Sequence, residues 1–241
     1  MNLLDSVAPG QSLEAFKTRA LADLPQAGRD RRVDLVRLVR ERLLDADDGV
    51  VSPTDYLRLF VGAPPPRRAA LLWGRFTFTM PLVSDVLDTL IRPALDRAER
   101  PMAPTDAAVL TQSDWDAALR ALLRPGAPAS VLDKTRSTLQ FVLSRCGVLM
   151  IQGTRARTTA VRRSEPDALA FSWLVAHELR SGPHSEVPER AAVTTSYAAR
   201  LFLPTAAHAT ACLEAGVRDG VIVRSYLMGS ARYHAPTPEV A

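Results

Sequence analysis

Aromatic residues are scarce in this chain of 241 residues, at 6% of the sequence. A hydrophobic core must therefore rest on leucine, valine and alanine, and that composition favours helices over an all-β sandwich. Apolar residues make up 47% and charged residues 23%, which is ordinary for a globular protein and excludes a wholly disordered chain. The length suffices for one large domain or for two to three small ones.

Cysteine is nearly absent as well. Cys146 and Cys212 cannot form a disulfide framework, and each lies in an apolar helical stretch, so we expect buried, inert thiols. The N-terminus lacks the basic segment and apolar core of a secretory signal. The uncharged stretch at residues 76–84 contains Pro81 and is far shorter than the ~20 apolar residues of a membrane-spanning helix. We therefore expect a cytoplasmic protein without membrane contact.

Signatures of catalysis are also missing. The sequence has no glycine-rich phosphate loop, no GxGxxG, no HExxH and no GxSxG elbow. The four histidines show no metal-ligand spacing with the cysteines, and no carboxylate pair stands out for metal-dependent nuclease chemistry. The sequence therefore predicts a protein that is not an enzyme and that needs no metal or cofactor.

Lysine is scarce too: among the 30 basic residues only Lys17 and Lys134 are lysines, and the others are arginines. The net charge is +4, with an isoelectric point near 9.5. Arginine suits bidentate contacts with phosphate and guanine, so the balance is consistent with nucleic-acid binding. A genome that favours arginine and alanine codons would give the same composition, so composition alone leaves both readings open.

Helical signals fill residues 1–110, which we interpret as an N-terminal helical region. One helix is expected at about residues 30–44, and the segment Ser52-Pro53-Thr54-Asp55 has the features of a helix start. Residues 67–91 form a long apolar helical stretch that Pro81 interrupts.

A helix, a turn, a second helix and a two-stranded hairpin are predicted in residues 111–166. The first helix is capped near Ser113 or Asp114, and the second spans about residues 131–146 until Gly147 ends it. Strands are expected at 148–152 and 158–163. This order is typical of a winged-helix unit, in which the helix before the hairpin reads the major groove. Residues 167–241 repeat the order, which predicts a second winged-helix-like unit.

Helix 131–146 has two different faces when it is drawn at 100° per residue. Leucine, valine and cysteine side chains share one arc with Thr135. The opposite arc holds Lys134, Ser137, Thr138, Gln140, Ser144 and Arg145, which are suited to phosphates and base edges. Phe141 lies within this polar arc, and one interpretation is that it packs on another domain.

Positive charge is concentrated in the same unit. Between Asp133 and Arg163 the net charge is +6, compared with +4 for the whole chain. The hairpin itself carries four arginines that could lie along phosphates, namely Arg155, Arg157, Arg162 and Arg163. The alternative is a solvated hairpin whose arginines serve solubility. The second unit is less basic, and it could support the fold, dimerise or bind a partner, while Arg218, Arg224 and Arg232 could touch phosphate.

Three segments together resemble the BrxA family, the small accessory proteins of BREX bacteriophage-exclusion systems. They read RRAALLWGRFTFTMPLVSDVLDTLIR at 67–92, TQSDWDAAL at 111–119 and DKTRSTLQFVLSRCGVL at 133–149. The resemblance covers roughly residues 30–165. It implies a non-enzymatic, winged-helix protein that binds double-stranded DNA beside a methyltransferase, an ATPase and a phosphatase-like protein. It assigns DNA contacts to Lys134, Thr135, Arg136 and Arg145. The arginine-rich hairpin and the chain beyond residue 166 are longer than the family pattern.

The sequence therefore predicts a DNA-binding accessory protein of an anti-phage system, with double-stranded DNA and other BREX proteins as partners. A stand-alone transcriptional regulator and a protein-interaction scaffold without DNA binding are the alternatives. RNA binding by a helical bundle is a third.

Overall fold

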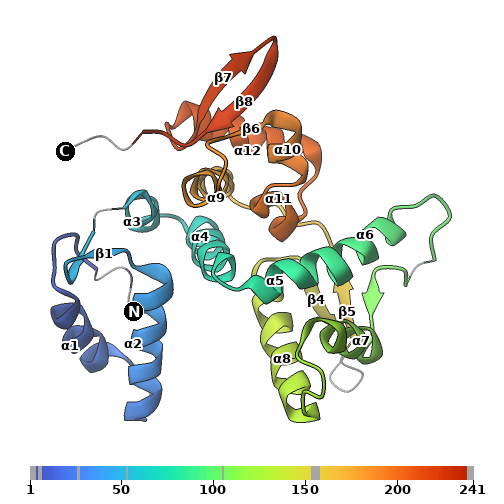
Figure 1. Ribbon diagram of the computed structural model, residues 1–241, viewed down its shortest axis with the longest axis horizontal. Helices are drawn as coiled ribbons and strands as arrows, with labels where there is room; N and C mark the ends of the chain where they lie inside the picture. The colour runs from blue at the N-terminus through green and yellow to red at the C-terminus, as the bar shows by residue number, and fades with distance from the viewer. Residues whose placement is uncertain are drawn as a thin grey trace.

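Helices dominate the computed structural model, which describes Leu4 and residues 7–25, 28–52, 54–104, 106–152 and 158–237. Small antiparallel sheets accompany the helices in this part of the chain (Figure 1). The prediction of a mainly helical protein is confirmed.

The N-terminal region begins with two helices that pack together, α1 (Leu13–Asp23) and α2 (Arg29–Leu43). Ser12 caps α1 because its hydroxyl accepts a hydrogen bond from the backbone N–H of Ala15. The short strands β1 (Ala46–Asp47) and β2 (Val50–Val51) then pair. Helix α3 (Asp55–Phe60) starts where the sequence predicts, and Thr54 is its N-cap.

Prolines mark the starts of the next helices. Helix α4 (Pro65–Phe78) starts at a proline, and Pro81 starts α5 (Pro81–Val86), so the predicted interruption at Pro81 is confirmed. A π-helical turn, η2 (Leu87–Ile91), connects α5 directly to α6 (Arg92–Ala98). Helix α4 contacts α2, α8 and α9, so it connects the N-terminal helices to the rest of the molecule.

A sheet and two helices form the first of two similar units. Its elements in chain order are β3 (Val109–Leu110), α7 (Gln112–Leu122), α8 (Ala129–Arg145), β4 (Leu149–Gln152) and β5 (Thr158–Val161). The sheet order is β3-β5-β4, because β3 pairs with β5. The sequence does not predict strand β3, which lies before residue 111, the expected start of this unit.

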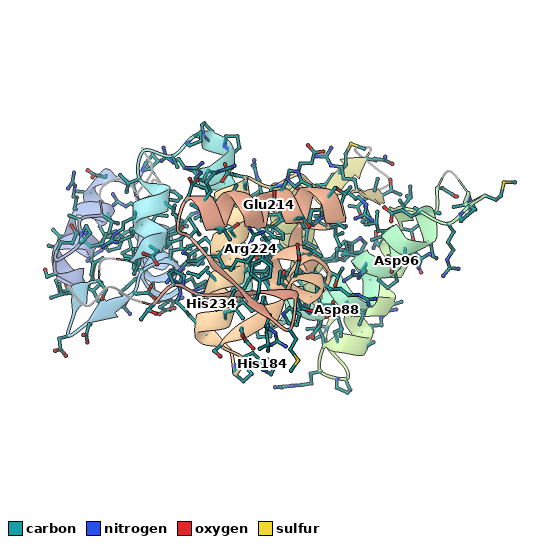
Figure 2. The ribbon with its side chains drawn as sticks, turned by 90° about the horizontal axis from the view of Figure 1, so that it is seen from above. Asp88, Asp96, His184, Glu214, Arg224 and His234 are labelled. Atoms are coloured by element: carbon teal, nitrogen blue, oxygen red, sulfur yellow. The ribbon has the colours of Figure 1, made fainter. Side chains whose placement is uncertain are left out.

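The C-terminal segment repeats this arrangement after helix α9 (Ala168–Ser181). Its elements are β6 (Glu186–Pro188), α10 (Glu189–Thr194), α11 (Tyr197–Phe202), α12 (Ala206–Arg218), β7 (Val223–Leu227) and β8 (Ser230–His234). Here too the short first strand pairs with the last one, which gives the order β6-β8-β7. Seen from above, α12 with Glu214 lies between the N-terminal helices and α6 (Figure 2).

Helix α9 is the centre of the core. Most of its residues are buried, and it packs closely against α12 and α4. A glycine permits the approach of α12, because a Cβ at Gly216 would lie 2.3 Å from the Cβ of Ser172 on α9. The Ser172 hydroxyl donates a hydrogen bond to the backbone oxygen of Cys212 across the same contact. Both cysteines are buried as predicted, and burial raises the pKa of the Cys212 thiol to about 12.

Candidate nucleic-acid interface

Helix α8 separates a buried stripe from an exposed polar face. Leu132, Leu139, Val142 and Leu143 are buried, as the sequence predicts. Lys134, Ser137, Thr138 and Arg145 are exposed, whereas Thr135, Gln140 and Ser144 are only partly exposed. The helix therefore presents two cations and two hydroxyl side chains to the outside.

Three exposed cations lie on α8 and beside its C-terminal end, namely Lys134, Arg145 and Arg162. In the described part of the chain, no carboxylate oxygen lies within 4.0 Å of Lys134, Arg145 or Arg162. The Arg162 side chain donates from Nε to the backbone oxygen of Gly147, which holds it at the C-terminal end of α8. Exposed cations spread along one helix–hairpin unit, with no acidic partner among the described residues, attract phosphate, since no local ion pair has to be broken first.

Arg136 does not belong to this exposed face, although the BrxA resemblance assigned it to DNA contact. Its side chain is 1% exposed, and it donates hydrogen bonds to Asp116 on α7 and to Asp133. That prediction is wrong, because the guanidinium holds α7 against α8. The spacing contained the signal: Arg136 follows Leu132 by four residues and precedes Leu139 by three, which places it on the buried stripe.

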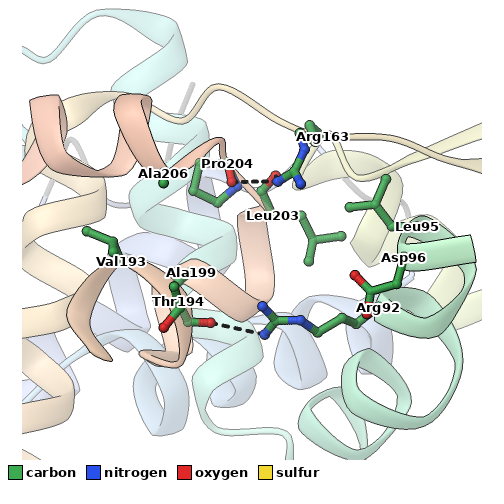
Figure 3. Close-up of a pocket in the computed structure, with 10 residues that line it drawn as sticks. All are labelled: Arg92, Leu95, Asp96, Arg163, Val193, Thr194, Ala199, Leu203, Pro204 and Ala206. Atoms are coloured by element: carbon green, nitrogen blue, oxygen red, sulfur yellow. Dashed lines mark hydrogen bonds between the residues drawn. The ribbon is translucent and has the colours of Figure 1, made fainter. Parts of the chain in front are cut away.

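Arg163 is exposed, but its guanidinium is already engaged by other groups of the protein. Its Nε and Nη2 atoms each lie 2.6 Å from a Glu99 carboxylate oxygen. Its Nη1 donates to the backbone oxygens of Leu203 and Pro204, at 3.3 and 2.8 Å (Figure 3). Because each of its nitrogens already has an acceptor, we leave Arg163 out of the candidate surface, while its contact with DNA stays a prediction.

A second arginine makes a similar contact in the same place. Arg92 on α6 donates from Nη1 to the backbone oxygen of Thr194 at 3.0 Å (Figure 3). The two arginines line a small cavity of about 150 Å³ where α6 meets the C-terminal unit. We call this contact the arginine joint; it consists of Arg92 and Arg163 with the carbonyls of Thr194, Leu203 and Pro204.

Two candidate residues, Arg155 and Arg157, lie outside the described residues. They stay predictions from the sequence. Apart from Arg163, which is ion-paired with Glu99, the exposed candidates that the structure describes are Lys134, Ser137, Thr138, Arg145 and Arg162.

Phe141 packs on another part of the molecule, which is one of the interpretations the sequence allows. Its ring meets Trp73 of α4 edge-to-face, with centroids 5.6 Å apart. The Arg145 guanidinium lies over the Phe141 ring, 5.1 Å from its centroid. Helix α4 thus lies against the C-terminal half of α8, and the N-terminal half with Lys134, Ser137 and Thr138 is the more open part.

The C-terminal unit has a different surface. The exposed side of α12 carries small side chains such as Ala207 and Ala211, together with Glu214 and Arg218. Arg232 forms an ion pair with Glu186, while Arg224 lies over the Tyr226 ring at 5.7 Å. This unit therefore has fewer free cations than the first, in agreement with its weaker charge.

Both hairpins expose apolar side chains, which sequence reasoning missed. Met150 and Ile151 are exposed on β4, as are Tyr226, Leu227 and Met228 at the end of the second hairpin. A period-2 pattern gives no sign of them, because a strand at the edge of a sheet has no fixed buried face until the whole sheet is known.

A larger hollow, of about 700 Å³, lies beside α3 and α9. Two ion pairs lie in its lining: Arg75 with Asp45 at 2.7 Å, and Arg180 with Asp55 at 3.0 Å. His177 stacks on Trp173 there, and burial, aided by Arg75 and Arg180, lowers its pKa to about 4. Within the described ranges, no group of three or more His, Cys, Asp or Glu side chains could hold a metal ion.

Comparison with known proteins gives no relative for this chain. No protein-family model, no curated protein and no solved structure matches it. Among the described residues, no helix combines the length and the apolar character needed to cross a bilayer.

Proposed function

We propose that this protein binds double-stranded DNA, chiefly through its phosphates. The observation that carries the proposal is the outer face of α8, where Lys134, Arg145 and neighbouring hydroxyls are exposed. Within the part of the chain that the structure describes, neither these two cations nor Arg162 at the C-terminal end of α8 has an acidic partner. The order β3, α7, α8, β4, β5 and the pairing of β3 with β5 support a winged-helix interpretation of this unit. In such units the helix before the hairpin enters the major groove.

The proposed footprint is smaller than the sequence suggested. Without Arg136 and Arg163 it contains five cations: Lys134, Arg145, Arg155, Arg157 and Arg162. If roughly three of them neutralise phosphates, log affinity falls with log salt at a slope of about −2.7. The affinity then drops about 40-fold between about 50 and 200 mM salt.

Fluorescence anisotropy with unrelated duplexes, titrated at several salt concentrations, tests this proposal. The double variant Lys134→Ala/Arg145→Ala should lower the slope by up to about two units, because two phosphate contacts are lost. The matched control is Arg19→Ala/Arg58→Ala, which removes two exposed, ion-paired arginines far from α8 and should leave the slope unchanged. DNA affinity of the α8 variant equal to the parent's at every salt concentration would overturn the footprint.

We also propose that the DNA-binding role belongs to BREX phage defence as an accessory, non-enzymatic function. The support is the resemblance of residues 30–165 to the BrxA family. Phage plating on cells that carry the defence operon, with and without this gene, measures the role. A footprint on its own promoter with unchanged phage plating would favour the stand-alone regulator instead.

The exposed apolar residues on both hairpins favour one second candidate, a protein-interaction scaffold. Met150, Ile151, Tyr226, Leu227 and Met228 offer apolar contact area that phosphate binding does not use. Salt-independent or absent DNA binding by the parent would favour this function over the first.

A further inference from the structure

The second hairpin ends in a strand with an unused edge. In the sheet β6-β8-β7, β7 pairs with β8 on one side, and no described strand pairs with its other side. The hairpin projects beyond the helices, so its outer edge lies away from the body (Figure 1). An uncovered edge offers unpaired backbone N–H and C=O groups to another strand.

The geometry of the turn between β7 and β8 determines which backbone groups of β7 point away from β8. Met228 and Gly229 both have positive φ, 49° and 79°, as a two-residue type I′ turn requires. Leu227 and Ser230 then close the hairpin as a hydrogen-bonded pair, and pairs alternate from there. The N–H and C=O groups of Arg224 and Tyr226 therefore point away from β8. Pro188 fits this pattern, because on β6 it lies opposite Arg232 at a place where no donor is needed.

We propose that β7 is a self-association edge, on which a second copy of this chain adds its own β7 in antiparallel orientation about a two-fold axis at Ser225. In this register Arg224 lies opposite Tyr226 of the second copy, and Val223 lies opposite its Leu227. The outward groups of Arg224 and Tyr226 then pair with those of the second copy, and the two-fold axis repeats each contact.

Charge selects this register over the one with its axis at Arg224. A two-fold axis at Arg224 would place two guanidinium groups directly opposite each other, which is unfavourable. The axis at Ser225 places each guanidinium opposite a tyrosine ring, the same partners that already lie 5.7 Å apart within one hairpin. Tyr226 is 67% and Met228 100% exposed, so pairing also removes apolar surface from water.

The interface is small. Stable complexes bury about 1,200–2,000 Å² in total, and one pair of five-residue strands with their tips stays below that range. The protein should therefore be a monomer at low micromolar concentration and an increasing fraction of dimer at hundreds of micromolar.

Sedimentation velocity across this concentration range, without DNA, tests the proposal. The parent should shift towards the dimer as concentration rises. Tyr226→Lys should stay monomeric, because the introduced ammonium group would face Arg224 of the second copy. The double variant Arg224→Glu/Tyr226→Lys should dimerise again, since opposite charges now face each other across the axis. Met150→Lys, an exposed apolar-to-lysine change on the other hairpin, should behave as the parent does.

Amide hydrogen exchange on the parent gives an independent readout. The N–H groups of Arg224 and Tyr226 should exchange more slowly at high concentration, while that of Ser225, already bonded within the hairpin, should not change. A parent that stays monomeric throughout, or a Tyr226→Lys variant that associates as the parent does, would overturn the β7 edge. Loss of association in Tyr226→Lys without recovery in the double variant would overturn the register at Ser225.

Discussion

At the scale of the residue, basic side chains on the same helix have opposite roles. Lys134 and Arg145 face outward from α8, whereas Arg136 is enclosed between Asp116 and Asp133. A buried guanidinium with two carboxylate partners is costly to remove, because the carboxylates lose their counter-charge and a cavity remains.

Replacing Arg136 by alanine should therefore lower the free energy of unfolding by about 2–3 kcal/mol. This loss is smaller than that expected for breaking a fully buried ion pair, because both aspartates reach solvent. Urea denaturation measures the change. The neighbouring substitution Lys134→Ala is the matched control and should stay within about 0.5 kcal/mol of the parent. Equal stability of Arg136→Ala and the parent would show that the guanidinium does not hold α7 to α8.

His177 makes folding depend on pH. Burial and nearby arginines lower its pKa to about 4 from the ordinary 6.5, so the unfolded chain binds a proton more readily than the folded one. The stabilising contribution is complete above pH 6.5 and is lost as the pH falls towards 4. From about pH 7 to about pH 4.5 this amounts to about 2 kcal/mol, at about 1.4 kcal/mol for each pKa unit.

The variant His177→Phe, which keeps a ring beside Trp173, should lose less stability on acidification than the parent by that amount. Denaturant unfolding at about pH 7 and about pH 4.5 compares the two proteins. The control variant is His184→Phe, because His184 lies in the exposed segment after α9. An identical pH dependence of parent and His177→Phe would refute the assignment.

At the scale of the element, the packing of α12 on α9 depends on the missing side chain of Gly216. Glycine-to-alanine changes inside exposed helices usually stabilise by up to about 1 kcal/mol. Here the sign should reverse: Gly216→Ala should destabilise by about 2 kcal/mol, because the new methyl group would overlap Ser172.

Exchanging the small and the larger residue between the two helices tests whether steric overlap causes the loss of stability. The double variant Gly216→Ala/Ser172→Gly should recover stability relative to Gly216→Ala, since the second change removes the opposing Cβ. Thermal unfolding followed by circular dichroism measures all three proteins. No recovery in the double variant would mean that the overlap is not the source of the loss.

The elements differ in how far the sequence predicts them. Helix periods, together with Pro81, Gly147 and the Thr54 cap, mark the helices and both hairpins, because these signals are local. Strands β3 and β6 are two and three residues long, and only pairing with β5 and β8 makes them strands. The buried stripe of α8 is predictable, Arg136 included, but its partner Asp116 is not, because that aspartate comes from another helix.

At the scale of the whole molecule, the proposed DNA surface and the β7 edge lie far apart. Helix α8 and the second hairpin are at opposite ends of the view in Figure 1. A duplex on α8 therefore leaves β7 accessible, and the two proposals are sterically compatible.

A dimer through β7 should then bridge two duplexes. A biotinylated duplex on beads should retain a second, fluorescent duplex when the parent is present at concentrations that favour the dimer. Tyr226→Lys should bind the first duplex normally and retain little of the second. Equal retention by both proteins would mean that bridging does not use the hairpin edge.

The arginine joint has a consequence for how this molecule can change over evolutionary time. Arg92 and Arg163 donate hydrogen bonds to backbone carbonyl oxygens of the C-terminal unit, and every amino acid has a backbone carbonyl oxygen. Substitutions at Thr194, which is partly exposed, can therefore accumulate without removing the acceptor, provided that the local backbone is kept. Sequence change should be freer at Thr194 than at the two guanidinium positions, and the unit beyond the joint can acquire new surfaces while its position relative to α6 is kept.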